Sequence, residues 1–108
     1  MNHLQSIVDT RLVTEVDVFD GKPENWKSFS WRFTNAVSSI GLDDAMRAAR
    51  QVDESDVRME SLTDPQQKIM CKSLFILLSQ KCRGRAEVLL RAAGPSQGFV
   101  AWQRLKAE

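Results

Sequence analysis

Residues 19–41 read FDGKPENWKSFSWRFTNAVSSIG and carry the strongest structural signal in the chain. Behind the turn formed by Asp20–Pro23, apolar side chains recur three and four positions apart. These residues are Trp26, Phe29, Phe33, Val37 and Ile40. At about 100° per residue they fall within an arc of about 80°, which is typical of the buried face of an amphipathic helix. We therefore predict a helix over Glu24–Ile40, with Gly41 as a left-handed C-terminal cap.

Trp31 lies within this helix but outside the apolar arc, because its position points roughly to the opposite side. Large aromatic side chains are usually buried in one way or another. We therefore expect Trp31 to be covered, either by the N-terminal arm or another helix of the same chain, or by a partner subunit. The second alternative makes Trp31 a candidate residue of an assembly interface.

Four further stretches of the chain carry helix signals. They are residues 42–51, 65–82, 85–93 and a last segment for which Ser96 is the expected cap. Asp64–Pro65 combines an N-cap residue with proline at the first helical position. Apolar side chains then cover most directions around residues 70–78, so this helix is expected at the centre of a bundle. In the last segment Phe99, Trp102 and Leu105 are expected to pack inward.

Three segments lie outside these helices. Residues 1–11 show little periodicity and are predicted to form a flexible lead-in. In residues 12–19 β-branched side chains cluster, which favours an extended arm lying on the helices, or at most a short hairpin. Residues 52–63 are predicted to form an acidic surface loop with a helical turn. The predicted fold is all-α: an orthogonal bundle of about five helices with an extended N-terminal arm, spanning residues 12–108.

The overall composition is that of an ordinary soluble globular protein. The chain has 108 residues, of which 43% are hydrophobic and 27% charged, and its formal net charge is +1. Its length suits one domain, and its net charge excludes a strongly basic nucleic-acid binder. Apolar runs fall short of the roughly 20 residues that span a membrane, and residues 1–10 lack the pattern of a secretory signal. We expect a cytoplasmic protein with no membrane partner and no small-molecule substrate.

The sequence offers little for catalysis or for metal binding. Cys71 and Cys82 lie in one predicted helix, where eleven residues separate them by roughly 16 Å, so they cannot form a disulfide. His3 is the one histidine, and no Cys/His set has zinc-site spacing. No serine or cysteine has a plausible base, and no glycine loop is of the phosphate-binding kind. We therefore predict no catalytic residue, no metal and no cofactor, and a protein that is not an enzyme.

Charge is distributed unevenly along the chain. Residues 42–64 are mainly acidic, whereas residues 65–91 are mainly basic. The basic candidates for a binding patch are Lys81, Arg83, Arg85 and Arg91. Three interpretations remain open for this pattern: electrostatic complementarity between subunits, a modest patch for RNA or an acidic partner, and ordinary solvated surface with cations near a helix C-terminus.

Three motifs keep their order and spacing along the chain. They are Phe19-x-Gly21 followed by Trp26, Phe29 and Phe33; Leu77-x(4)-Cys82-x-Gly84-x-Ala86-x(2)-Leu89-Leu90; and Gly98-Phe99-x-Ala101-Trp102-x(2)-Leu105. From Leu12 to Leu105 this pattern resembles the Gag polyprotein of LTR retrotransposons of the copia and gypsy types. In that family the first tryptophan opens the first long helix, a G-x-A step joins two central helices, and W-x-x-L belongs to a later helix.

The resemblance implies a fold similar to the N-terminal domain of a retroviral capsid, over residues 12–108. It also implies a structural role: homo-oligomeric self-association into a particle shell that packages element RNA, with the RNA bound by other parts of the polyprotein. A zinc knuckle, a protease and a polymerase segment are not found in this sequence, which is expected to be a fragment truncated at its C-terminus. Two alternatives stay open: a domesticated host adaptor that binds a partner peptide in a hydrophobic groove, and a weak RNA-binding module.

Overall fold

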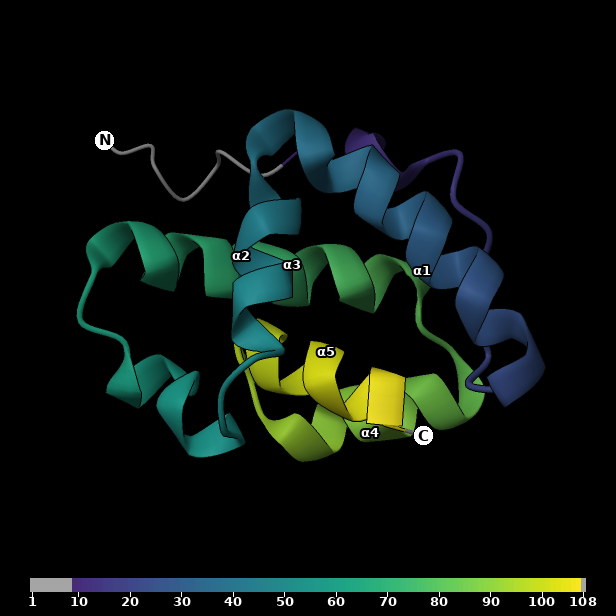
Figure 1. Ribbon diagram of the computed structural model, residues 1–108. Helices are drawn as coiled ribbons and strands as arrows, with labels where there is room; N and C mark the ends of the chain where they lie inside the picture. Colours follow the sequence, from purple (N-terminus) through teal and green to yellow (C-terminus); the bar gives the residue numbers. More distant parts are fainter. Residues whose placement is uncertain (1–8, 108) are drawn as a thin grey trace.

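The computed structural model describes residues 9–107. These residues contain five α-helices and four 3₁₀ turns, joined by short connecting segments (Figure 1). The helices are α1 (Pro23–Val37), α2 (Leu42–Ala49), α3 (Pro65–Lys81), α4 (Gly84–Ala93) and α5 (Gly98–Ala107). The 3₁₀ turns are η2 (Thr10–Val13), η3 (Ser38–Ile40), η4 (Glu54–Asp56) and η5 (Met59–Ser61). The prediction of an all-α bundle of about five helices is confirmed.

Helix α3 is the central element of the bundle. Its start follows the predicted signal, because the Asp64 side chain accepts a hydrogen bond of 3.0 Å from the backbone N–H of Gln66 and proline occupies the first turn. Leu74, Leu77 and Leu78 are fully buried. In Figure 1 α3 runs across the middle of the molecule, with α1 above it and α4 and α5 below it. Helix α2 crosses α3 and contacts both α3 and α5.

Helices α3 and α5 pack with their backbones unusually close. A Cβ atom at Gly98 would collide with the carbonyl oxygen of Cys71 and would lie 2.8 Å from the backbone nitrogen of Phe75. Glycine at the start of α5 therefore lets α5 approach α3. This contact places the buried side chains of Phe99 and Trp102 in the core, as the sequence predicted.

Helix α1 buries most of the predicted arc but ends earlier than expected. Phe29, Phe33 and Val37 are buried, and Gly41 has the left-handed φ of +77° that the cap prediction required. The prediction was wrong for Ile40, which is 44% exposed. The α-helix stops at Val37 and continues as η3, whose three residues per turn rotate Ile40 away from the buried face.

The N-terminal arm is extended only at its end. The expectation of an extended segment from residue 12 was wrong, because Thr10–Val13 forms η2, in which the Asp9 carboxylate accepts from the backbone N–H of Arg11 at 2.9 Å. Phe19 is extended and forms an isolated parallel bridge with Cys82, with its N–H donating to the carbonyl of Lys81 at 2.8 Å. Local capping therefore overrides the β propensity at the start of the arm.

The start of α5 and the N-terminal lead-in also differ from the sequence-based expectations. Ser96 does not cap α5: its φ is +64°, and Gln97 precedes the helix, with its carbonyl accepting from Ala101 at 2.9 Å. Of the predicted lead-in, residues 1–8 lie outside the described residues, while residues 10 and 11 belong to η2. Within residues 9–107 no helix is both long and apolar enough to cross a bilayer.

Candidate functional site

A surface hollow of about 320 Å³ lies where α1, the end of α2 and α5 meet, and all three tryptophans of the chain line it. Trp26 and Trp31 come from α1, and Trp102 comes from α5. The rings of Trp26 and Trp102 pack together with a centroid distance of 5.1 Å. Trp102 also stacks on Phe33 at 5.7 Å, which ties this side of the hollow to the core. The hollow is therefore a rigid, aromatic feature of the surface.

Trp31 stands at this hollow with 67% of its surface exposed. Of the covers expected for Trp31, those within the same chain are not found among residues 9–107. The described part of the N-terminal arm, which was one of them, packs on the other flank of α1, where Phe19 stacks on Phe29 at 4.9 Å between ring centroids. Because large aromatic side chains are costly to leave in water, an exposed tryptophan beside a hollow is typical of a contact surface.

The hollow is positively charged. Lys27, Arg50 and Lys106 line it together with the tryptophans, and the lining residues include no carboxylate. Each of the three cations is exposed, and within the described chain none of them forms an ion pair. Such a combination of aromatic surface and unpaired cations favours a partner that is apolar and acidic.

The indole N–H of Trp102 is buried and unpaired within the described chain. Trp102 is 2% exposed, and its Nε1 has no hydrogen-bond partner among the described residues. A buried N–H without an acceptor costs roughly 1 to 3 kcal/mol. Because this nitrogen is itself buried, the missing hydrogen bond is a cost within the core, and a partner at the surface does not remove it.

A second, shallower hollow of about 280 Å³ continues the same surface. It shares Arg50 and Lys106 with the tryptophan hollow and adds Val52, Gln103 and Ala107. The Gln103 Nε2 donates to the carbonyl oxygen of Val52 at 3.0 Å, which holds this part of the chain against α5. The surface thus runs without interruption from Trp31 through the two shared cations to Val52.

The predicted basic patch lies elsewhere, around the junction of α3 and α4. Arg83 donates from Nη1 to the carbonyl oxygens of Cys82 at 2.8 Å and Ser79 at 3.2 Å, so its charge stabilises the C-terminal end of α3. Arg91 forms an ion pair with Glu87 at 2.8 Å, one helical turn away. Arg83 and Arg91 are therefore engaged within the chain. Lys81 and Arg85 lie at the same junction, where Lys81 is partly buried, and the Arg85 side chain also has an interaction of its own.

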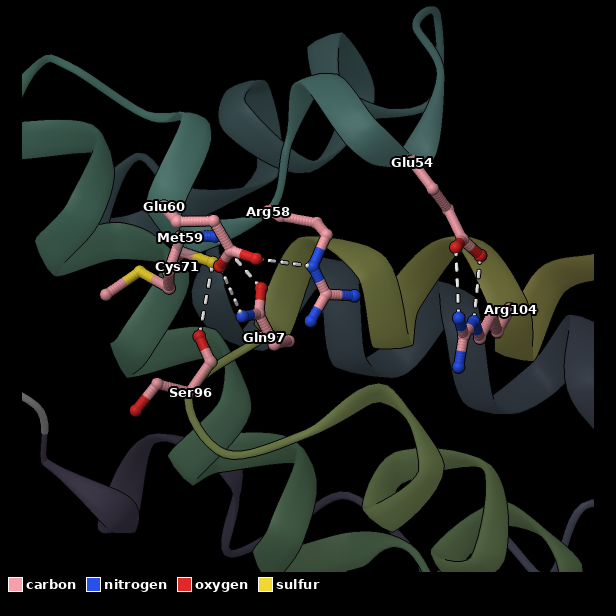
Figure 2. A network of polar contacts seen from close by, with 8 residues as sticks. All are labelled: Glu54, Arg58, Met59, Glu60, Cys71, Ser96, Gln97 and Arg104. Carbon is pink, nitrogen blue, oxygen red and sulfur yellow. Dashed lines mark hydrogen bonds and ion pairs between the residues drawn. The ribbon is translucent and has the colours of Figure 1, made fainter.

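The acidic connector between α2 and α3 is held down by ionic contacts (Figure 2). Arg104 forms two hydrogen bonds with the Glu54 carboxylate, at 2.8 and 3.0 Å. Arg58 donates to Glu60 at 2.9 Å, and Gln97 Nε2 donates to the same carboxylate at 3.1 Å. The hydrogen bond from Arg58 lowers the pKa of Glu60 to about 2, and the hydrogen bond from Arg104 lowers the pKa of Glu54.

These pKa shifts bear on chemistry as well as on stability. A general acid at neutral pH needs a raised pKa, whereas the pKa values of both Glu54 and Glu60 are lowered by their cationic partners. The contacts are therefore of the kind that anchors a segment. Figure 2 shows Glu54 of the connector bound to Arg104 of α5, and Glu60 bound to Gln97, directly before α5.

The two cysteines are buried thiols. The prediction that they do not pair is confirmed, since both are free. Cys71 Sγ lies 3.3 Å from the carbonyl oxygen of Ser96, to which it donates, and burial raises its pKa. Burial raises the pKa of Cys82 to about 12. Both thiols are therefore protonated near neutral pH and poor nucleophiles. Within residues 9–107 no group of His, Cys, Asp and Glu could hold a metal, and His3 lies outside that range.

Sequence reasoning identified Trp31 but missed the cations beside it. Lys27, Arg50 and Lys106 are far apart in the sequence, and only the crossing of α1, α2 and α5 brings them together. No protein-family model, curated protein or solved structure matches this chain.

Proposed function

We propose that this chain is a Gag-like capsid domain, a non-enzymatic cytoplasmic structural protein that self-associates into a particle shell around element RNA. The observation that carries the proposal is Trp31, which is 67% exposed beside a hollow lined by the two other tryptophans. In this proposal Trp31 and the hollow form the contact between copies.

The energy available from such a contact is substantial. A tryptophan buries about 250 Å² at most, so covering the exposed two-thirds of Trp31 contributes roughly 4 kcal/mol at about 25 cal/mol per Å². Tryptophan is also among the residues that dominate measured binding energies at protein interfaces. A single aromatic contact of this size is enough to make association depend on one residue.

The arrangement of the helices supports the capsid part of the proposal. Trp26 lies in the first turns of α1, Gly84 begins α4 directly after α3, and Trp102 lies in α5. These are the places that the motifs occupy in the Gag family, as the resemblance implies. The proposal leaves RNA packaging to other parts of the polyprotein.

Association measured by multi-angle light scattering tests the proposal. The wild-type chain should form species larger than a monomer as concentration rises, and Trp31→Ala should remain monomeric. Val88→Ala is the matched control, because Val88 is 62% exposed on α4 and does not line either hollow. Equal association of wild type and Trp31→Ala would contradict the assignment of Trp31 to the contact.

One observation favours a second candidate, a host adaptor that binds a partner peptide. The hollow joins the exposed ring of Trp31 to three cations, Lys27, Arg50 and Lys106, and a peptide with an apolar and an acidic side chain fits such a surface. In that case the wild-type chain would stay monomeric at every concentration and would bind the peptide in a ratio of one to one. The RNA-binding module has weaker support, because Arg83 and Arg91 are engaged within the chain.

A further inference from the structure

We infer that the tryptophan hollow receives the acidic edge of a second copy, the segment Val52–Asp56, and that the two copies are related by a two-fold axis. This inference rests on the proposed self-association and adds to it the partner surface and the symmetry. Its evidence is the distribution of charge and exposed apolar surface on one face of the molecule.

The receiving side of this contact is cationic and apolar. Trp31 supplies the apolar surface, and Lys27, Arg50 and Lys106 supply three positive charges with no carboxylate among the lining residues. Charge of one sign beside an exposed aromatic side chain selects a partner of opposite sign. The inserted surface must therefore carry both an apolar side chain and carboxylates.

The acidic edge carries both of these. Val52 is 45% exposed, and Asp53 and Asp56 are exposed and form no ion pair within the described chain. Between them Glu54 is tied to Arg104 of α5, as Figure 2 shows. This contact fixes the edge in place, so less conformational entropy is lost when the edge is inserted.

The position of the edge sets the symmetry. Val52 lines the second hollow, which shares Arg50 and Lys106 with the tryptophan hollow, so the edge and the receiving site lie on one face. When complementary patches are neighbours on one face, a two-fold rotation places each edge over the hollow of the other copy. Both contacts then form at once, and the carboxylates of Asp53 and Asp56 meet the cations Arg50 and Lys106 of the other copy.

Val18, another exposed apolar residue beside an acid, is less suitable as the inserted edge. Val18 is 54% exposed next to Asp17, but Arg32 lines the same hollow as both residues. The charge at that site is therefore balanced within the chain. It also lies on the flank of α1 that carries Phe29 rather than on the flank that carries Trp31, so it offers no self-complementary face.

Charge reversal tests the inference with two variants of the full chain. Arg50→Glu/Lys106→Glu makes the hollow negative, and Asp53→Lys/Asp56→Lys makes the edge positive. Each variant alone would place like charges together, so its self-association should weaken by about 100-fold or more relative to wild type. A mixture of the two should form a heterodimer, because each hollow then meets an edge of opposite charge.

Native mass spectrometry and sedimentation of the mixture distinguish the outcomes, and circular dichroism confirms that each variant is folded. A heterodimer with one copy of each variant is the expected result. Open-ended growth of the mixture would overturn the two-fold arrangement in favour of head-to-tail contacts. If both variants associate like wild type while Trp31→Ala does not, the acidic edge is excluded but the proposed self-association stands.

Two further outcomes would also overturn the inference. A wild-type chain that is monomeric at all concentrations would contradict both the inference and the proposed function. A monomer that binds a single-stranded oligonucleotide with strong salt dependence, and loses that binding in Arg50→Glu/Lys106→Glu, would assign the hollow to nucleic acid instead. Asp17→Lys is the matched control, since the inference expects it to leave association unchanged.

Discussion

Trp31 and Phe33 are two aromatic residues of one helix with opposite environments. Phe33 is fully buried and contacts both Phe29 and Trp102, whereas Trp31 is 67% exposed. The periodicity of α1 predicted this separation of faces, because Trp31 fell outside the apolar arc. It could not predict the lack of a cover, since that depends on where the N-terminal arm packs. Aromatic side chains are buried in most cases, and this general tendency does not hold for Trp31 within the described chain.

At this scale the two aromatics should respond differently to truncation. Phe33→Ala should lower the free energy of unfolding by about 3 to 5 kcal/mol, because it leaves a cavity in the core. Trp31→Ala should change the free energy of unfolding of the monomer by less than about 0.5 kcal/mol. Urea denaturation at low protein concentration measures both values. A loss of several kcal/mol in Trp31→Ala would place this residue in the core and would contradict the interface assignment.

The elements of this fold are held together by a few specific junctions. The closest is the crossing of α3 and α5 at Gly98, and the most polar joins the connector between α2 and α3 to Gln97 and Arg104. The sequence predicted the start of α3 from Asp64–Pro65, because capping is local chemistry. It did not predict either junction, since the contacts of Gly98, Gln97 and Arg104 join residues more than 20 positions apart in the chain.

Gly98→Ala tests the crossing of α3 and α5. In an ordinary helix this change stabilises by about 1 kcal/mol. Here the new methyl group would meet the backbone of Cys71 and Phe75, so we expect the chain to lose roughly 2 to 3 kcal/mol. Gly41→Ala is the control, because no atom lies within 4 Å of its Cβ position and only the strain of a positive φ, about 1 kcal/mol, applies. Thermal unfolding that ranks Gly98→Ala above wild type would refute the close crossing.

The pH dependence of stability tests the connector. The pKa of Glu60 is lowered to about 2 by Arg58, below the value of about 4.3 for a free glutamate. A lowered pKa in the folded state means that this contact stabilises fully above about pH 5 and is lost as pH falls through the folded value. The melting temperature of wild type should therefore exceed that of Glu60→Gln at neutral pH, and the difference should vanish towards about pH 2. A difference that stays constant with pH would argue against an ionic role for Glu60.

At the scale of the whole molecule, the sequence predicted the class of fold, the number of helices and most of their bounds. Those features follow from periodicity and capping within single segments. The tryptophan hollow was not predictable in the same way, because it joins α1, α2 and α5, and its charge comes from residues that are distant in the sequence. The predicted basic patch was drawn from residues that are close in the sequence, and in the structure Arg83 and Arg91 have partners close by in the chain.

Sedimentation equilibrium of the wild-type chain, from about 10 μM to about 1 mM, tests the central claim that this domain works by binding copies of itself. The account predicts that the average mass rises with concentration, and that it rises less at high salt because the contact joins opposite charges. A mass that stays at the 12.3 kDa of a monomer over the whole range would contradict the account.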